Sequence, residues 1–370
     1  MGTILNQYQP DVVFHPGVTL KEKMDEMKMS NKEFALRTGK PEKTIIAVLK
    51  GESSLTPEMA ILFEKVTHIP ASFWINKQAR YSEYVARKKH EQDIEEAKGW
   101  AGKFPYPQMA KYGWITPTRN KDEKVSNLFS FFGIASYKSW DRLYMQSDLK
   151  VAAYTSLKFT HEPHAISAWL RIGELQSKEI SAPVFDIKRL KGNIPLMREL
   201  MVNQPKDFFN RLKRLCLEAG VKVIYTPSLP KVPLCGSTRW INETPLVQLT
   251  ARYRQNDRFW FYFFHELGHI ILHGKKFISL EGLKGLDFSS VNKVKEDEAN
   301  DYAQKCTFTK EQEDKLLKEN PMIITEDEII DYARKFNTHP AIIIGRLQHD
   351  KKIGFNVGRE FIVSIDLNSL

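Results

Sequence analysis

Residues 259–274 form an apolar, helix-like run that constrains this chain more than any other segment. The run contains H-E-x-x-H. Because residues four apart share one face of a helix, His265 and His269 can present two ring nitrogens to one metal ion. Glu266 lies about 100° round the helix from His265, close enough to take a proton from metal-bound water without binding the metal itself. A five-letter motif also occurs by chance. Here, however, its three ionisable groups lie in apolar surroundings and need a partner, which a metal ion supplies.

A catalytic zinc site takes three protein ligands and keeps a fourth position for water. Residues 294–306 predict a second helix, on which Glu296, Ala299 and Asn300 share one stripe. We therefore expect Glu296 to be the third ligand, and Asn300 to accept the free ring N–H of a ligand histidine. Glu298 lies on another side of this helix and is the alternative ligand. For both glutamates the competing interpretation is a solvated acidic face.

His273 lies on the same stripe as the two motif histidines. It is two turns from His265, about 12 Å along the helix axis, which is too far to share the metal ion. A zinc pattern with a later histidine ligand would need His at the position of Lys275. A carboxylate third ligand is therefore the better interpretation.

Several segments together resemble the ImmA/IrrE family of metallopeptidases, over roughly residues 190–370. They are residues 238–240, 245–249, 259–274, 296–303 and 345–349. The resemblance implies a zincin-like domain in which two histidines and one glutamate bind Zn2+. It also implies a gluzincin-like zinc metallo-endopeptidase that cleaves a specific regulatory protein, such as a repressor, and does not digest proteins in bulk.

The amino-terminal end carries an independent pattern. Residues 30–33 read as a capping box that opens a short helix, and Gly39 ends it. Residues 41–51 predict another short helix with Gly at its end, and Thr56 with Pro57 begins a third. Two short helices separated by glycine form a helix-turn-helix pattern.

Residues 14–89 resemble the HigA-type antitoxins among the Xre helix-turn-helix proteins, through residues 14–17, 56–58, 69–74 and 87–89. The resemblance implies a repressor that binds operator DNA, usually as a homodimer, with the second helix of the pair in the major groove. The expected DNA contacts are Lys40, Lys43, Thr44 and Lys50. Thr44 is the candidate for a base edge and the lysines for phosphates.

Composition agrees with a globular protein of two or three domains, since 42% of the residues are hydrophobic and 27% charged. Three scattered cysteines, the lack of a targeting segment and the lack of a membrane-spanning run predict a cytoplasmic protein. The net charge of +10 is concentrated in residues 101–225, which hold 20 Lys and Arg against 11 Asp and Glu. This excess could extend a DNA footprint or bind an acidic partner, but a solvated surface is the commoner explanation.

The middle of the chain reads as mainly helical. Residues 99–117 predict a linker, and residues 124–132, 139–145, 165–174 and 206–219 predict amphipathic helices. His161 and His164 flank a proline, which indicates a surface loop and not a second metal site. Residues 221–225 and 246–251 predict strands of a small sheet.

Together these patterns predict an α+β protein that is mainly helical. Its expected domains are a helix-turn-helix domain (1–98), a linker and helical middle region (99–189) and a zincin-like domain (190–370). The predicted function is that of a DNA-binding regulator or antitoxin with a zinc endopeptidase, in which substrate pairs with the strand at 246–251 and Tyr253, Arg346 or His349 stabilises the oxyanion. The alternative is a non-cleaving antitoxin whose peptidase-like domain only binds a partner protein, such as a toxin.

Overall fold

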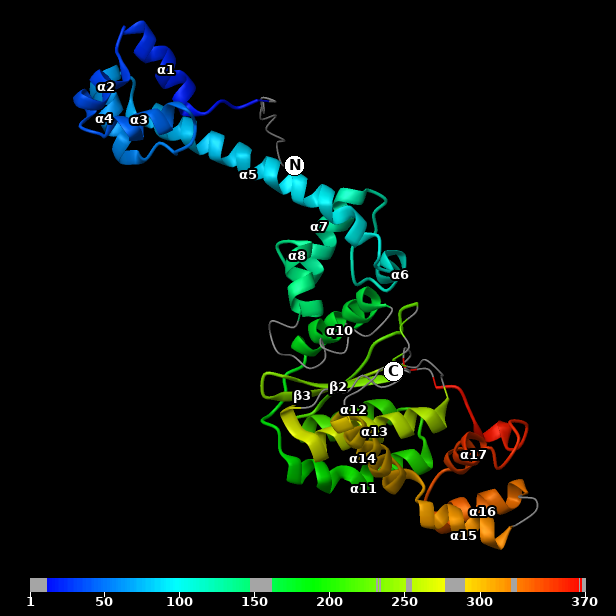
Figure 1. The fold of residues 1–370 in the computed structure, drawn as a ribbon. Coiled ribbons are helices and arrows are strands. Elements are labelled where there is room, and N and C mark those ends of the chain that lie inside the picture. Colours follow the sequence, from blue (N-terminus) through cyan, green and yellow to red (C-terminus); the bar gives the residue numbers. More distant parts are fainter. Residues whose placement is uncertain are drawn as a thin grey trace, which may run out of the picture. The chain divides into compact units, whose positions relative to one another are not determined.

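The structure, a computed structural model, describes residues 12–146, 162–230, 232, 234–250, 255–276, 290–320, 325–365 and 367. The chain divides into two compact units, Met1–Glu96 and Ala97–Leu370, here called unit 1 and unit 2 (Figure 1). The described part is mainly helical with one small sheet, as predicted. The domain boundaries expected at 98/99 and 189/190 stay predictions. None of the described helices has both the length and the apolar character needed to cross a membrane.

Unit 1 is a bundle of short helices followed by a long one. The helices are α1 (Pro16–Glu26), α2 (Asn31–Thr38), α3 (Glu42–Leu49), α4 (Pro57–Thr67) and the first part of α5 (Ala71–Ala101). The Ser30 hydroxyl accepts a hydrogen bond from the backbone N–H of Glu33 and caps α2, which forms half of the predicted capping box. The Glu33 carboxylate instead accepts from Arg37, one turn later. Gly39 ends α2 at φ 65°, a conformation that glycine adopts without strain.

The core of unit 1 is aromatic and holds α2, α4 and α5 together. The side chains of Phe34, Phe63 and Trp74 are fully buried. Their rings meet edge to face, with centroids 5.0 Å apart for Phe34 and Phe63 and 6.0 Å apart for Phe63 and Trp74. Ile45 and Val48 bury one side of α3 in the same core. The opposite side of α3 is thereby fixed toward solvent.

Unit 2 begins with a helical layer that contains an aromatic cluster. Its elements are the end of α5, α6 (Tyr106–Lys111), α7 (Lys121–Phe132), α8 (Tyr137–Trp140), a short π-helix η1 (Asp141–Gln146) and α10 (Pro163–Lys178). The linker expected from residue 99 is wrong at its start, because α5 continues to Ala101 and buries Trp100 against Phe104 and Trp140. Packing there outweighs the helix-weakening effect of Gly99.

The two histidines that were expected in a surface loop have different outcomes. His161 lies outside the described residues. His164 lies in the first turn of α10, because Pro163 occupies the first helical position, where its missing N–H costs nothing. The His164 ring stacks on Trp140 with centroids 4.5 Å apart. Burial is the main reason that its pKa falls from 6.5 to about 4.

A three-stranded sheet lies at the centre of unit 2, in the order β1–β3–β2. The strands are β1 (Lys222–Tyr225), β2 (Gly236–Ile241) and β3 (Thr244–Leu249), with β3 parallel to β1 and antiparallel to β2. Val223 pairs with Val247, and Val247 with Thr238, so these three side chains share one face.

Helices cover both faces of the sheet (Figure 1). On one face, α10 packs closely, with Gly173 against the side chain of Gln248, whose amide donates to the carbonyl of Trp169 at 2.8 Å. On the other face lie α12 (Phe208–Glu218) and α13 (Asn256–His273), which share one apolar core with Val223 and Val247. The remaining elements are α11 (Ile187–Asn203), η2 (Gly274–Lys276), α14 (Ser290–Thr307), α15 (Lys310–Glu319), α16 (Glu326–Phe336), α17 (Pro340–His349) and η3 (Arg359–Phe361).

Candidate metal centre and nucleic-acid interface

Helix α13 carries the H-E-x-x-H motif into the interior of unit 2. Phe259, Trp260, Phe263 and Phe264 anchor it in the core, and this apolar burial fixes the rotation of the helix. A Cβ added at Gly268 would lie 3.1 Å from the ring of Tyr302, on α14, and 3.4 Å from Ala299 Cα. The missing side chain at residue 268 therefore lets α14 approach the face of α13 that carries the histidines.

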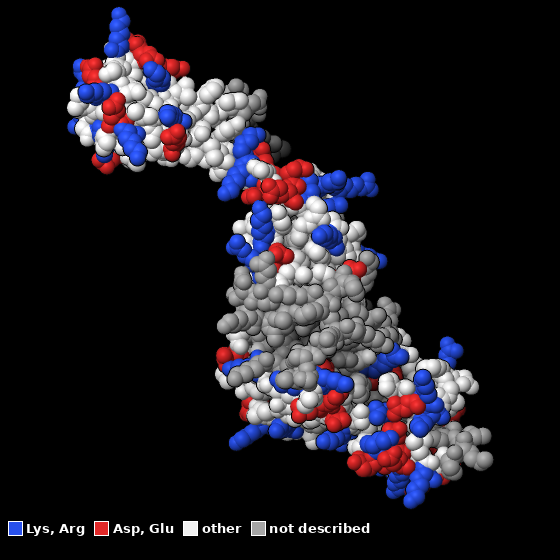
Figure 2. Space-filling model, in the orientation of Figure 1, with Lys and Arg blue, Asp and Glu red and all other residues white. Residues whose placement is uncertain are grey.

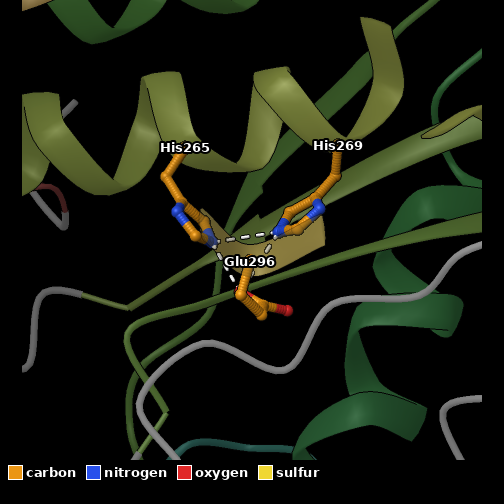
Figure 3. Close-up of side chains that lie close together, drawn as sticks. All are labelled: His265, His269 and Glu296. Carbon is orange, nitrogen blue, oxygen red and sulfur yellow. Dashed lines mark hydrogen bonds and ion pairs between the residues drawn. The ribbon is translucent and has the colours of Figure 1, made fainter. Parts of the chain in front are cut away.

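That approach brings together the three residues predicted as metal ligands, His265, His269 and Glu296 (Figure 3). The two Nε2 atoms lie 3.0 Å apart. Oε2 of Glu296 lies 3.1 Å from His265 Nε2 and 3.5 Å from His269 Nε2. Both histidine side chains are fully buried, and 21% of the Glu296 side chain is exposed. One side of the cluster is therefore closer to solvent.

The cluster fits a zinc ion in geometry and in chemistry. Ligand atoms bonded to tetrahedral zinc at about 2.0–2.1 Å lie about 3.3 Å from one another, close to the three separations in this cluster. The His265 ring places its Nδ1 2.9 Å from Oδ1 of Asn300, as predicted, so Nδ1–H donates to the amide and the Nε2 lone pair is left for a metal. Two imidazole nitrogens and a carboxylate oxygen then converge, and a cation satisfies all three.

The electrostatics of the cluster favour the forms that bind a metal. Burial lowers the pKa of His269 to about 4, and its hydrogen bond with Glu296 offsets this only in part. Burial by itself would raise the pKa of Glu296, but hydrogen bonds with His265 and His269 hold that pKa at about 2. At neutral pH the imidazole of His269 is therefore uncharged and the carboxylate ionised, the states in which these groups are zinc ligands.

Glu266 is fully buried between α13 and the sheet. The hydroxyl of Thr238, on β2, donates a hydrogen bond of 3.0 Å to the backbone carbonyl of Glu266 and ties this turn of the helix to the strand. A Cβ added at Gly236 would lie only 2.7 Å from Glu266 Oε1. Glycine at residue 236 thus leaves the space that the carboxylate occupies, a role that the sequence did not reveal.

Sequence reasoning excluded His273 as a ligand but missed its contacts. Its Nδ1 lies 2.9 Å from His269 Nδ1, and its Nε2 lies 2.9 Å from Oε2 of Glu298. The alternative ligand Glu298 therefore contacts His273, and the cluster of possible metal ligands among the described residues contains Glu296 instead. The spacing of His269 and His273, one turn apart, was the signal that could have indicated this contact.

Two of the three residues suggested for oxyanion stabilisation, Arg346 and His349, have other partners in the structure. Tyr253 lies outside the described residues. Arg346 pairs with Glu313 at 3.4 Å and with Asp350 at 3.2 Å, which occupies its guanidinium elsewhere. The His349 side chain is 80% exposed and contacts Asp350.

In unit 1 the structure places the expected DNA contacts around α3. Lys43 and Thr44 lie in its first turn, with Lys43 exposed, and Lys50 is exposed at its carboxyl end. Lys40 precedes the helix and pairs with Glu58 at 2.6 Å, so a phosphate would have to replace this ion pair. Figure 2 shows basic and acidic side chains interspersed over the visible face of unit 1.

Comparison with known proteins identifies this part of the chain. The helix-turn-helix family model matches residues 20–74. An HTH-type transcriptional regulator of Escherichia coli K12, YddM, is 36% identical over 73 residues, which are 20% of this chain and 78% of that protein.

Solved structures also match this chain. An addiction module antidote protein of the HigA family from Coxiella burnetii is 32% identical and has a TM-score of 0.22, over 23% of this chain and 92% of that one. The Pseudomonas aeruginosa antitoxin HigA, solved with the higBA promoter, is 26% identical and has a TM-score of 0.22, over 23% of this chain and 94% of that one. From the match to the family model and the identity with YddM, the chain belongs to the helix-turn-helix family of DNA-binding regulators, with residues 20–74 as its family domain.

Proposed function

We propose that this protein is a DNA-binding transcriptional regulator of antitoxin type whose unit 2 is a zinc-dependent endopeptidase that cleaves a specific regulatory protein. One observation carries the enzymatic part. His265, His269 and Glu296 converge to within zinc-binding distance of one another, and Glu266 follows the first of them in the same helix. Three protein ligands leave one position for water, which is the arrangement of a catalytic and not a structural zinc site.

The residues of unit 2 divide the proposed chemistry among them. A bound zinc ion would supply a Lewis acid and a water of lowered pKa, near 7. His265, His269 and Glu296 would hold it, and Asn300 would fix the ring of His265. Glu266 removes a proton from the attacking water and later delivers it to the leaving amine.

The strand at which substrate was expected to pair requires a correction. The sequence favoured residues 246–251, but β3 is the central strand and has β1 on one side and β2 on the other. Its backbone groups are therefore already used by the sheet. Among the described strands β2 lies at an edge of the sheet, and it runs along α13, with Gly236 against the side chain of Glu266. We place an extended substrate segment along β2.

The DNA-binding part of the proposal rests on α3. Its apolar side is buried, and Lys43 and Thr44 stand on its first turn, where a helix that enters the major groove makes its contacts. The sequence resemblance to HigA-type antitoxins supports operator DNA as one partner and a homodimer as the binding form. It also supports a protein partner, either a toxin or a substrate.

The competing function is that of an antitoxin whose unit 2 binds a partner without cutting it. Glu266 favours the enzyme, because a binding module has no need of a base beside its metal ligands. A pull-down with Glu266→Gln separates the two, since the variant keeps the size of the side chain and removes the base. We expect the variant to retain an intact partner that the parent protein releases as fragments. If both proteins retain the same intact partner with zinc bound, the non-cleaving function is correct.

A further inference from the structure

A chain of hydrogen bonds leads from the back of His269 to the surface of unit 2. Nδ1 of His269 contacts Nδ1 of His273 at 2.9 Å, and Nε2 of His273 contacts Oε2 of Glu298 at 2.9 Å. The His273 side chain is 4% exposed, whereas that of Glu298 is 55% exposed. An almost fully buried imidazole therefore joins a prospective metal ligand to a surface carboxylate.

The donor and acceptor roles along these hydrogen bonds follow from the positions of the protons. If Nε2 of His269 uses its lone pair for a metal, Nδ1 of the neutral ring must carry the proton and donate it. Nδ1 of His273 must then accept, which leaves the His273 proton on Nε2, where it donates to Glu298. In this arrangement every contact joins a donor to an acceptor. The contacts beyond the metal ligands are therefore compatible with the metal-binding tautomer of His269.

We infer that His273 and Glu298 are positioning residues that hold the His269 ring and its tautomer for zinc, an inference that rests on the proposed zinc site. The two histidine ligands are supported differently. His265 donates to the neutral amide of Asn300, whereas His269 donates to an imidazole that a carboxylate polarises. The negative charge of Glu298, at the far end of the hydrogen bonds behind His269, makes His269 a more basic ligand. Zinc affinity should therefore depend on residues that do not touch the metal.

The first test is zinc affinity, measured on the full-length protein by competition for Zn2+ with a chromophoric chelator. His273→Ala removes the acceptor behind His269, and we expect zinc to bind about 10- to 100-fold more weakly. Glu298→Ala removes the carboxylate, and we expect a loss of about 10-fold. Glu298→Gln keeps an oxygen that can accept from His273, so its affinity should lie between those of the parent and Glu298→Ala.

Asp301→Ala is the matched control, because it removes an exposed carboxylate from the same helix. We expect it to bind zinc like the parent. If His273→Ala does not keep the helical circular dichroism of the parent, the Glu298 variants carry the test, since that side chain is largely exposed.

The second measurement is the ring ¹⁵N spectrum of the histidines, with and without zinc. The inference requires the His273 proton on Nε2 and the His269 proton on Nδ1 in the zinc-loaded protein, and Glu298→Ala should shift the His273 resonances. A His273 proton on Nδ1 in the loaded protein would overturn it, as would equal zinc affinities of the parent, His273→Ala and Glu298→Ala.

The outcome is separable from that of the proposed function. A protein that binds zinc with the expected dependence on His273 and Glu298 but cleaves no partner would refute the endopeptidase and leave these residues in their positioning role. If the protein cleaves its partner and neither substitution changes its zinc affinity, the endopeptidase stands and the positioning role of His273 and Glu298 is refuted.

Discussion

Gly236→Ala tests whether the position of the Glu266 carboxylate, and not only its presence, supports catalysis. The added Cβ would lie 2.7 Å from Oε1, 3.0 Å from Cγ and 3.2 Å from Cδ of Glu266. Carbon and oxygen atoms in contact ordinarily lie about 3.5 Å apart, so the carboxylate must move by roughly 0.8 Å. Because Glu266 is fully buried, it has no solvent to turn into.

A catalytic group misplaced by about 1 Å can cost about 100-fold in rate. We therefore expect Gly236→Ala to cleave a protein partner about 100-fold more slowly, while it still binds one zinc ion per chain because no predicted ligand is touched. The assay is the initial rate of fragment formation, followed by mass spectrometry at equal zinc content. The matched control is Gly192→Ala in α11, where an added Cβ meets nothing within 4 Å. Cleavage by Gly236→Ala at the parent rate would refute this view of the site.

Three further predictions concern DNA binding, the metal and pH. Lys43→Ala combined with Thr44→Ala should abolish binding to the native promoter, measured by fluorescence anisotropy, and leave the zinc content unchanged. Normal binding of this variant would exclude α3 as the recognition helix. Glu296→Ala should lose stoichiometric zinc in elemental analysis, whereas Glu298→Ala keeps one zinc ion at saturating zinc; the reverse result would make Glu298 the ligand. Folding lowers the pKa of His164 from 6.5 to about 4, so as the pH falls the imidazole becomes protonated in the unfolded chain before it does in the folded protein. The free energy of unfolding therefore falls as the pH drops from 6.5 to 4. His164→Phe lacks this group, so its free energy of unfolding relative to that of the parent should rise by about 1 kcal/mol between pH 6.5 and 4 in urea unfolding, after allowance for the partly exposed ring. The same difference between variant and parent at both pH values would contradict this.

The convergence of His265, His269 and Glu296 could be predicted from the sequence because its information is local. Four-residue spacing places His265 and His269 on one face, and the stripe shared by Glu296 and Asn300 separates Glu296 from Glu298. Only the docking of α14 on α13 was needed beyond this. Helical periodicity could show which side chains would meet if the two helices packed, but not that they would pack.

The features that the sequence missed depend on contacts between distant segments. The central place of β3 follows from its pairing with β1, in which Lys222 lies beside Leu246, 24 residues later, and no local pattern records this. The contact of His273 with Glu298 joins residues that are 25 apart. Likewise, α5 runs past Gly99 because Trp100 is buried among aromatic rings of later helices. In each case tertiary packing decided between structures that local propensity left open.

The most direct test of the central claim is a comparison of new protein N-termini in cells that produce either the parent protein or Glu266→Gln. Both proteins should bind one zinc ion per chain and the same promoter. We expect the parent to generate a new N-terminus in one regulatory protein or a few, and Glu266→Gln to generate it at least about 100-fold more slowly. Identical sets of N-termini at equal zinc content would contradict a peptidase in which Glu266 is the base, and would leave a zinc-binding regulator that recognises its partner without cutting it.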